Sequence, residues 1–139
     1  MANVIIHENA DGLAAITRPS KEWTGTLDEL ATKLKLSSYE IIDESKIPSD
    51  RTFRNAWVKG SGVVTEDVTK SKAIAHGTRR EKRAAEFKPH DEIISLNIPG
   101  QDATAAETER VKIRTKYETM QTNIDNATDI AGIKTALGG

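Results

Sequence analysis

The hydrophobic pattern changes period near residue 65, and this change constrains the fold of the chain more than any other feature. Before it, short β-rich runs alternate with turn residues. After it, helix-forming residues continue for most of the remaining length. This order predicts an α+β protein whose strands and helices are separated along the chain. We expect a small antiparallel sheet domain with one short helix over residues 1–66 and a long helical hairpin extension over residues 67–139.

Two turn signals place the strands of the predicted sheet. The apolar run at residues 4–6 is followed by an Asp-Gly pair within residues 9–12, which supplies the positive φ that a hairpin turn requires, and the chain returns through residues 13–17. A second turn, Gly-Ser-Gly at residues 60–62, joins strands expected over residues 53–59 and 63–65. Both signals predict antiparallel hairpins.

The sheet domain also contains one predicted helix and one further strand. Thr26 is placed to cap the helix, and Glu29 three residues later completes a capping box. The apolar face of this helix should pack on the sheet and consists of Leu27, Leu30, Ala31 and Leu34. With the strand at residues 39–43, the sheet would hold about five short strands.

The first long helix should begin at Thr65 or Asp67 and run to Lys88. Pro89 is expected to interrupt it, because an interior proline loses a backbone hydrogen bond, and residues 91–98 would resume after a kink. The dipeptide at residues 99–100, Pro-Gly, then separates the two long helices.

The second long helix should start near Ala103, break at residues 126–129 and leave a short helix ending at Leu137. Its narrow apolar seam is predicted at Arg110 or Val111, Ile113, Tyr117, Met120, Ile124 and Ala127. The preceding helix offers a poorer stripe of Ile74, Gly77, Ala84, Phe87, Ile94 and Ile98. Two such stripes predict an antiparallel helical hairpin.

Composition limits the classes of function. The chain has 139 residues, of which 37% are hydrophobic and only 4% aromatic, so we expect an elongated shape or a partner that covers apolar surface. The formal net charge of -1 gives no global attraction to nucleic acid or membranes. No apolar run approaches the roughly 18 residues of a membrane span. The absence of cysteine excludes disulfides and thiolate chemistry.

No constellation of catalytic residues is visible in the sequence. The three histidines, His7, His76 and His90, are far apart, and none has the spacing of a metal-binding pair. The Gly-Ser-Gly loop lacks the later glycine and lysine of a phosphate-binding loop, and no serine lies in a nucleophile context. We therefore predict no enzymatic activity, cofactor or metal.

Positive charge is concentrated along the first long helix. Residues 68–90 contain seven basic and two acidic side chains. The cluster of Arg79, Arg80, Lys82 and Arg83 suits contact with phosphates, but no aromatic residues interleave to stack on bases, and Glu81 and Glu86 offer salt-bridge partners. A solvated or protein-facing helix surface is favoured, and nucleic-acid binding is the alternative.

The run at residues 48–57, Pro-Ser-Asp-Arg-Thr-Phe-Arg-Asn-Ala-Trp, concentrates aromatic and arginine side chains. Alternation along a strand would place Phe53, Asn55 and Trp57 on the core face and Arg54, Ala56 and Val58 on the other. Arginine and tryptophan are also typical of interface centres. The predicted partner-contact residues are Arg51, Phe53, Arg54, Trp57, Arg79, Arg80, Arg83 and Tyr117.

This run, with the basic residues and Ala-Ile-Ala-His that follow it at residues 70–80, resembles a group of short phage and prophage proteins. They share an Asp-Arg-Thr-Phe-Arg-Asn-Ala-Trp signature followed by a basic helix. The resemblance is closest over residues 41–83 and extends loosely to the helical end around Arg114, Lys116, Tyr117 and Met120. The group supplies no catalytic or binding residue to carry over.

The resemblance implies a protein of a phage structural region, concerned with the tail, the tail fibres or their assembly. We therefore expect a non-enzymatic virion component, made in the bacterial cytoplasm, that contacts other phage structural proteins or further copies of itself. A tail or tail-fibre assembly chaperone that leaves the finished particle is the first alternative. A nucleic-acid-binding protein that uses the basic helix is the second.

Overall fold

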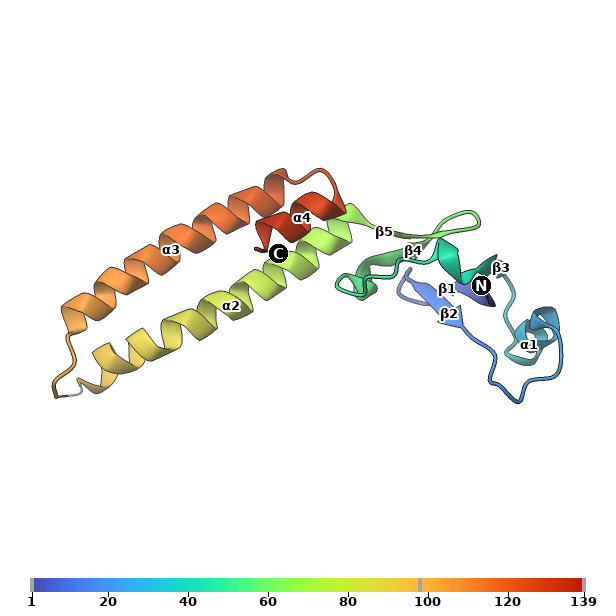
Figure 1. The fold of residues 1–139 in the computed structure, drawn as a ribbon, viewed down its shortest axis with the longest axis horizontal. Coiled ribbons are helices and arrows are strands. Elements are labelled where there is room, and N and C mark those ends of the chain that lie inside the picture. Colours follow the sequence, from blue (N-terminus) through green and yellow to red (C-terminus); the bar gives the residue numbers. More distant parts are fainter. Residues whose placement is uncertain (1, 98, 139) are drawn as a thin grey trace. The chain divides into compact units, whose positions relative to one another are not determined.

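The computed structural model describes residues 2–97 and 99–138. The chain divides into two compact units, residues 1–70 and 71–139, so the boundary lies four residues after the expected one (Figure 1). Small antiparallel sheets occur in the N-terminal unit and long helices in the C-terminal unit, which confirms the α+β class. No helix in the described part of the chain is both long and apolar enough to cross a membrane.

The first sheet contains three antiparallel strands in the order β2-β1-β3. These are β1 (Asn3–Glu8), β2 (Ala14–Thr17) and β3 (Glu40–Asp43). The predicted turn between β1 and β2 is confirmed: Gly12 has a φ of 76°, which an L side chain would rarely adopt. The carboxamide oxygen of Asn9 accepts hydrogen bonds from two backbone amides of the same turn.

The second hairpin forms a separate sheet of β4 (Trp57–Lys59) and β5 (Val64–Glu66), so the prediction of one five-stranded sheet is wrong. The strand predicted over residues 53–59 is also too long, because Arg54–Ala56 form a 3-10 turn. Between residues 51 and 56, backbone amides donate to carbonyls three residues earlier. These local bonds take the place of the hydrogen bonds to a neighbouring strand that the prediction required. The predicted alternation fails in consequence, since the adjacent residues Ala56 and Trp57 are both buried.

The two sheets share one hydrophobic core. Its buried residues are Val4, Ile6, Ala14, Ile42, Trp57 and Val64. Strand β1 is central: Ile5, which points to the opposite face from Val4 and Ile6, is also fully buried. The N-terminal unit is therefore organised around β1, with Trp57 as the largest side chain of the core.

Helix α1 (Leu27–Lys33) confirms the predicted capping box. The Thr26 hydroxyl accepts from the amide of Glu29 at 3.1 Å, and the Glu29 carboxylate accepts from the amide of Thr26 at 3.2 Å. The predicted apolar face is only partly covered, because Ala31 is buried whereas Leu34, just beyond the last helical residue, is 46% exposed.

The C-terminal unit consists of α2 (Val68–Leu96), α3 (Ala103–Asn126) and α4 (Ile130–Ala136). Contacts between α2 and α3 join residue 91 to 110, 86 to 116 and 76 to 125, so the two helices run antiparallel (Figure 1). The helical hairpin, the break after α3 and the short last helix are confirmed. Carboxylates cap all three helices, from Asp67, Asp102 and Asp129.

Pro89 does not end α2, which continues to Leu96, so the predicted interruption is wrong. An interior proline costs roughly 3 kcal/mol or more. Contacts with α3 hold the helix on both sides of the proline: Lys116 binds Glu86 at 2.8 Å and Arg110 binds Asp91 at 2.8 Å. Phe87 packs with residues of α3 between these two ion pairs.

The predicted seam of α3 is largely confirmed. Ile113, Tyr117 and Ile124 are buried, and Met120 packs against the cluster formed by Phe87, Ile113 and Tyr117. At the start of the seam the partly buried residue is Arg110, whereas Val111 is 49% exposed.

The predicted stripe of α2 is wrong apart from Phe87. The buried residues of this helix are Ser71, Ala75, Arg79 and Phe87. Ala84 and Ile94 are exposed, Ile74 and Gly77 are partly buried, and Ile98 lies outside the described residues. Small and long polar side chains, not the isoleucines, fill the contact face.

Replacing Gly77 in the interior of α2 by alanine is expected to stabilise the C-terminal unit by roughly 0.5–1 kcal/mol. An added Cβ would meet no heavy atom within 4 Å outside the helix's own neighbouring backbone, so the gain in helix propensity is not opposed by a clash. Urea unfolding followed by circular dichroism would measure the gain. Gly62→Ala is the contrast, because its φ of 70° makes a side chain unfavourable, and it should lose stability. A destabilised Gly77→Ala variant would contradict the prediction.

Candidate partner-binding sites

The predicted contact residues fall into two groups, one in each unit. Those of the N-terminal unit surround Trp57, and those of the C-terminal unit lie on α2 and α3. Arg51 and Trp57 of the first group line one cavity, and all residues of the second group line another. The structure therefore brings together the residues that the sequence suggested within each unit.

The aromatic rings of the N-terminal group belong to the core. Phe53 and Trp57 are each 1% exposed, so neither ring offers a free surface. This agrees with the interpretation that both aromatics anchor the sheet domain. Partner contact at this site stays a prediction, and it would involve the charged side chains around the two rings.

Two arginines cover the Trp57 ring. The Cζ atom of Arg54 lies 4.6 Å from the ring centroid and that of Arg51 lies 5.6 Å from it, both within cation–π range. Arg54 also donates from Nη1 to the carbonyl of Ala14 at 3.2 Å. Burial, and then the charges of Arg51 and Arg18, lower the pKa of Arg54 from its ordinary value. The three guanidinium groups make this region positive.

A cavity of about 290 Å³ opens beside Trp57. We call it the tryptophan cavity, and it is lined by Arg18, Glu44, Ile47, Pro48, Ser49, Arg51 and Trp57. Its one acidic lining residue, Glu44, is already held by Arg18, whose Nε donates to Oε1 at 2.6 Å. No sequence pattern pointed to Arg18 or Glu44, because 26 residues separate them.

The C-terminal group lines a second cavity, of about 450 Å³, between α2 and α3. We call it the arginine cavity, and it is lined by Arg79, Arg80, Arg83, Ala84, Tyr117, Glu118 and Gln121. All four contact residues predicted for this unit are among them. Sequence analysis missed Glu118 and Gln121, which only the pairing of the helices brings to this place.

Arg79 is held in place by a chain of hydrogen bonds. Its side chain is largely buried, with the residue 9% exposed, and its Nε donates to Nδ1 of His76 at 3.2 Å. Because Nδ1 accepts this bond, the proton of the neutral ring is on Nε2, which donates to Oδ1 of Asp125 at 2.7 Å. Lys72 donates to the carbonyl of Asp125, which ties the end of α3 to the same cluster.

The arginines of this cavity are not neutralised within the chain. Among residues 2–97 and 99–138, the structure shows no ion pair for Arg79, Arg80 or Arg83. Of the two salt-bridge partners that the sequence offered, Glu86 binds Lys116 on α3 instead. The cavity therefore carries uncompensated positive charge, which an anionic group could neutralise.

Glu86 and Tyr117 affect each other's protonation beside this cavity. The Lys116 ammonium, and then the Tyr117 hydroxyl, lower the pKa of Glu86 from its ordinary value of 4.5 by hydrogen bonding to the carboxylate. Burial, and then the hydrogen bond with Glu86, raise the pKa of Tyr117. Both shifts favour a charged Glu86 and a neutral Tyr117 at neutral pH.

Glu86→Gln is expected to reduce the acid sensitivity of the C-terminal unit. A depressed folded-state pKa contributes stability that is present above the unfolded value, about 4.5, and is lost as the pH falls through the folded value. The free energy of unfolding should thus fall more steeply on acidification in the unsubstituted protein than in the variant. Urea unfolding at a series of pH values would measure the slopes.

The matched control for this pH series is Glu81→Gln. Glu81 is an exposed carboxylate of the same helix, and the described residues provide no ion pair for it. Its replacement should leave the slope of stability against pH close to that of the unsubstituted protein. Equal slopes for Glu86→Gln and the unsubstituted protein would contradict the role given to Glu86.

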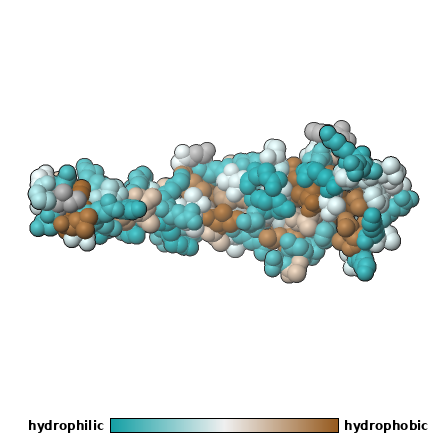
Figure 2. Space-filling model, turned by 90° about the horizontal axis from the view of Figure 1, so that it is seen from below, coloured by the Kyte–Doolittle hydropathy of each residue, from teal (hydrophilic) through white to brown (hydrophobic). Residues whose placement is uncertain are grey.

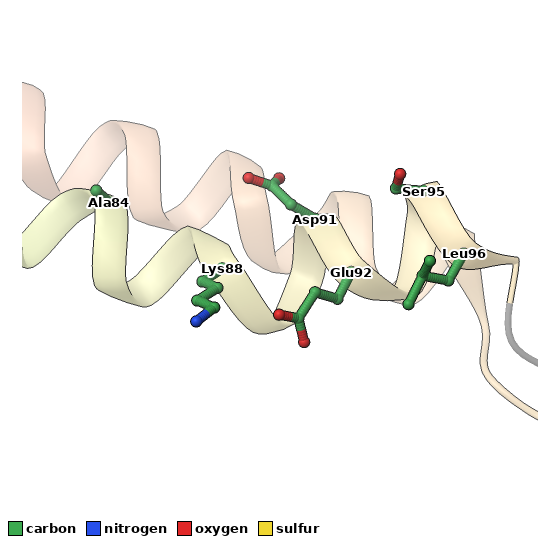
Figure 3. A pocket seen from close by; sticks show the side chains of 6 residues that line it. All are labelled: Ala84, Lys88, Asp91, Glu92, Ser95 and Leu96. Atoms are coloured by element: carbon green, nitrogen blue, oxygen red, sulfur yellow. The ribbon is translucent and has the colours of Figure 1, made fainter.

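A third hollow, of about 450 Å³, lies along the C-terminal half of α2 and contains none of the predicted residues. Figure 3 shows its lining side chains, which are Ala84, Lys88, Asp91, Glu92, Ser95 and Leu96. Leu96 is 67% exposed, and Asp91 binds Arg110 of α3. Elsewhere, the face drawn in Figure 2 shows separate hydrophobic patches within a largely hydrophilic surface.

No metal centre is assembled from the described residues, where no group of three histidine or carboxylate side chains is placed to hold an ion. His76 instead accepts a hydrogen bond from Arg79 and orients its side chain. His7 contributes to a polar cavity of about 370 Å³ with Glu8, Lys35 and Lys59 among its lining residues. The oriented arginine and the polar cavity are both suited to binding charged groups.

No family model, curated protein or solved structure matches this chain, so its function is inferred from its own residues and their geometry.

Proposed function

We propose that this chain is a non-enzymatic bacteriophage virion component, an adaptor or a minor tail or fibre-associated protein that joins larger structural proteins. The resemblance of the run at residues 47–57 and the basic helix to short phage proteins supports the setting. Protein–protein contact is the mode of action.

One observation carries the contact role: the predicted residues Arg79, Arg80, Arg83 and Tyr117 converge on one cavity, and no carboxylate of the described residues forms an ion pair with these arginines. Guanidinium groups left without a counterion are costly unless they are solvated or meet an anionic partner. A cavity that concentrates three of them provides a specific surface for another chain, because charge complementarity guides encounter and selects partners.

Mass spectrometry of purified, nuclease-treated particles tests the proposal. A structural component should be detected at a fixed copy number relative to the major capsid protein. If the chain is present in infected-cell lysate but missing from particles, it is an assembly chaperone and the virion role is rejected. Light scattering of the purified chain would show whether it forms homo-oligomers.

Nucleic-acid binding is a second candidate, and the same unpaired arginines favour it. Arginine forks can bind phosphate oxygens as well as carboxylates. If the chain acts this way, reversing the charge of Arg80 and Arg83 should abolish binding to an oligonucleotide and flatten its dependence on salt. Unchanged binding and salt dependence would reject this candidate.

A further inference from the structure

We infer that the arginine cavity binds a carboxylate-rich peptide segment of a partner protein. This inference rests on the proposed function and specifies the chemistry of the partner. Three guanidinium groups line the cavity against a single carboxylate, that of Glu118, and none of the three forms an ion pair with a carboxylate of the described residues. The planar arginine fork matches the two oxygens of a carboxylate in spacing and direction.

Two of the arginines are positioned before any ligand arrives. Arg79 is fixed by the bond from its Nε to His76, which Asp125 holds in turn. Arg83 lies over the ring of Phe87, with its Cζ atom 4.7 Å from the ring centroid. Side chains ordered in advance lose less conformational entropy on binding, so the cavity is suited to a defined ligand.

The walls of the cavity favour a peptide over a nucleic acid. Single-stranded nucleic acid is bound through exposed aromatic rings on which bases stack. The one aromatic lining residue, Tyr117, is 2% exposed and packs with Phe87 and Ile113, so its ring face is not available. Glu118 would repel phosphate and carboxylate groups alike, but the amide of Gln121 can pair with the main chain of a peptide.

The size of the cavity agrees with a short segment. Its volume of about 450 Å³ lies within the range of sites that enclose small ligands. A few residues with acidic side chains could therefore fill it, with the rest of the partner outside. Arg80, which is exposed at its edge, is placed to pair with a second acidic side chain.

The test is fluorescence anisotropy with a labelled polyglutamate peptide and the full chain. Polyglutamate should bind, and polyglutamine of equal length should not. Arg80→Glu and Arg83→Glu should each weaken polyglutamate binding about tenfold or more, because each removes a charge-assisted contact. Lys88→Glu makes the same change of charge on the same helix outside the cavity and should leave binding nearly unchanged.

Both arginines are exposed, so their replacement should not unfold the helices, and circular dichroism of each variant checks this. Absence of polyglutamate binding, or equal loss in Lys88→Glu, overturns the inference. Tighter binding of a labelled oligothymidylate, with the same dependence on Arg80 and Arg83, also overturns it in favour of nucleic acid. Detection of the chain in particles without polyglutamate binding would reject this ligand and leave the virion role intact.

Discussion

Replacing Trp57 by alanine is expected to lower the free energy of unfolding of the N-terminal unit by about 3–5 kcal/mol. Trp57 is 1% exposed and is the largest fully buried side chain of the described residues. It packs with residues from both sheets, so its loss would leave a cavity at the place where they meet. A unit of about 70 residues has a small free energy of unfolding. A loss of this size should therefore unfold a large fraction of the N-terminal units in the population.

Urea unfolding followed by circular dichroism measures the effect of Trp57→Ala. Trp23→Ala is the matched control: Trp23 is only partly buried, with its Nε1 bonded to the carbonyl of Thr26, and its replacement should cost much less. Similar losses in the two variants would show that Trp57 is not the centre of the core.

Replacing Tyr117 by alanine is expected to destabilise the C-terminal unit by about 3–5 kcal/mol, as for other large buried aromatics. Its ring is 2% exposed and joins Phe87 of α2 to Ile113 of α3. These contacts lie between the helices of the hairpin, so removal of the ring weakens the contact that holds them together. Loss of the hydroxyl also removes a hydrogen bond with Glu86.

Tyr117→Phe separates the two contributions. It keeps the ring and removes only the hydroxyl, so the expected loss is about 1 kcal/mol. Val111→Ala, at a position of α3 that is 49% exposed, should change stability by less than about 0.5 kcal/mol. If Tyr117→Phe cost as much as Tyr117→Ala, the hydroxyl and not the ring would be the main contribution.

These variants also separate folding from partner contact. Loss of Trp57 or Tyr117 would abolish binding by unfolding a unit, so these residues cannot report a contact role on their own. Arg80 and Arg83 are exposed and can be changed in a folded protein. The contact role predicted for the arginines is therefore tested without loss of the core.

Local signals in the sequence determined most of the elements. The capping box of Thr26 and Glu29, the turn at Gly12 and the break at residues 99–100 involve residues within a few positions of one another. Such features depend on backbone geometry and nearby hydrogen bonds, which a sequence displays directly. The seam of α3 was predictable for the same reason, since its period of 3.6 residues is local.

Only tertiary structure decided the contact face of α2, the passage of the helix through Pro89 and the separation of the two sheets. Ser71 and Arg79 are buried although they are polar, and Arg79 lies beside residues of α3 that are distant in the sequence, which no hydrophobic period reveals. Beside the arginine cavity, Glu86 binds Lys116, 30 residues away, and not one of the cavity's arginines. The sequence alone determined most of the local turns, caps and helices, whereas pairing between distant segments determined the packing faces and which charges remain available for a partner.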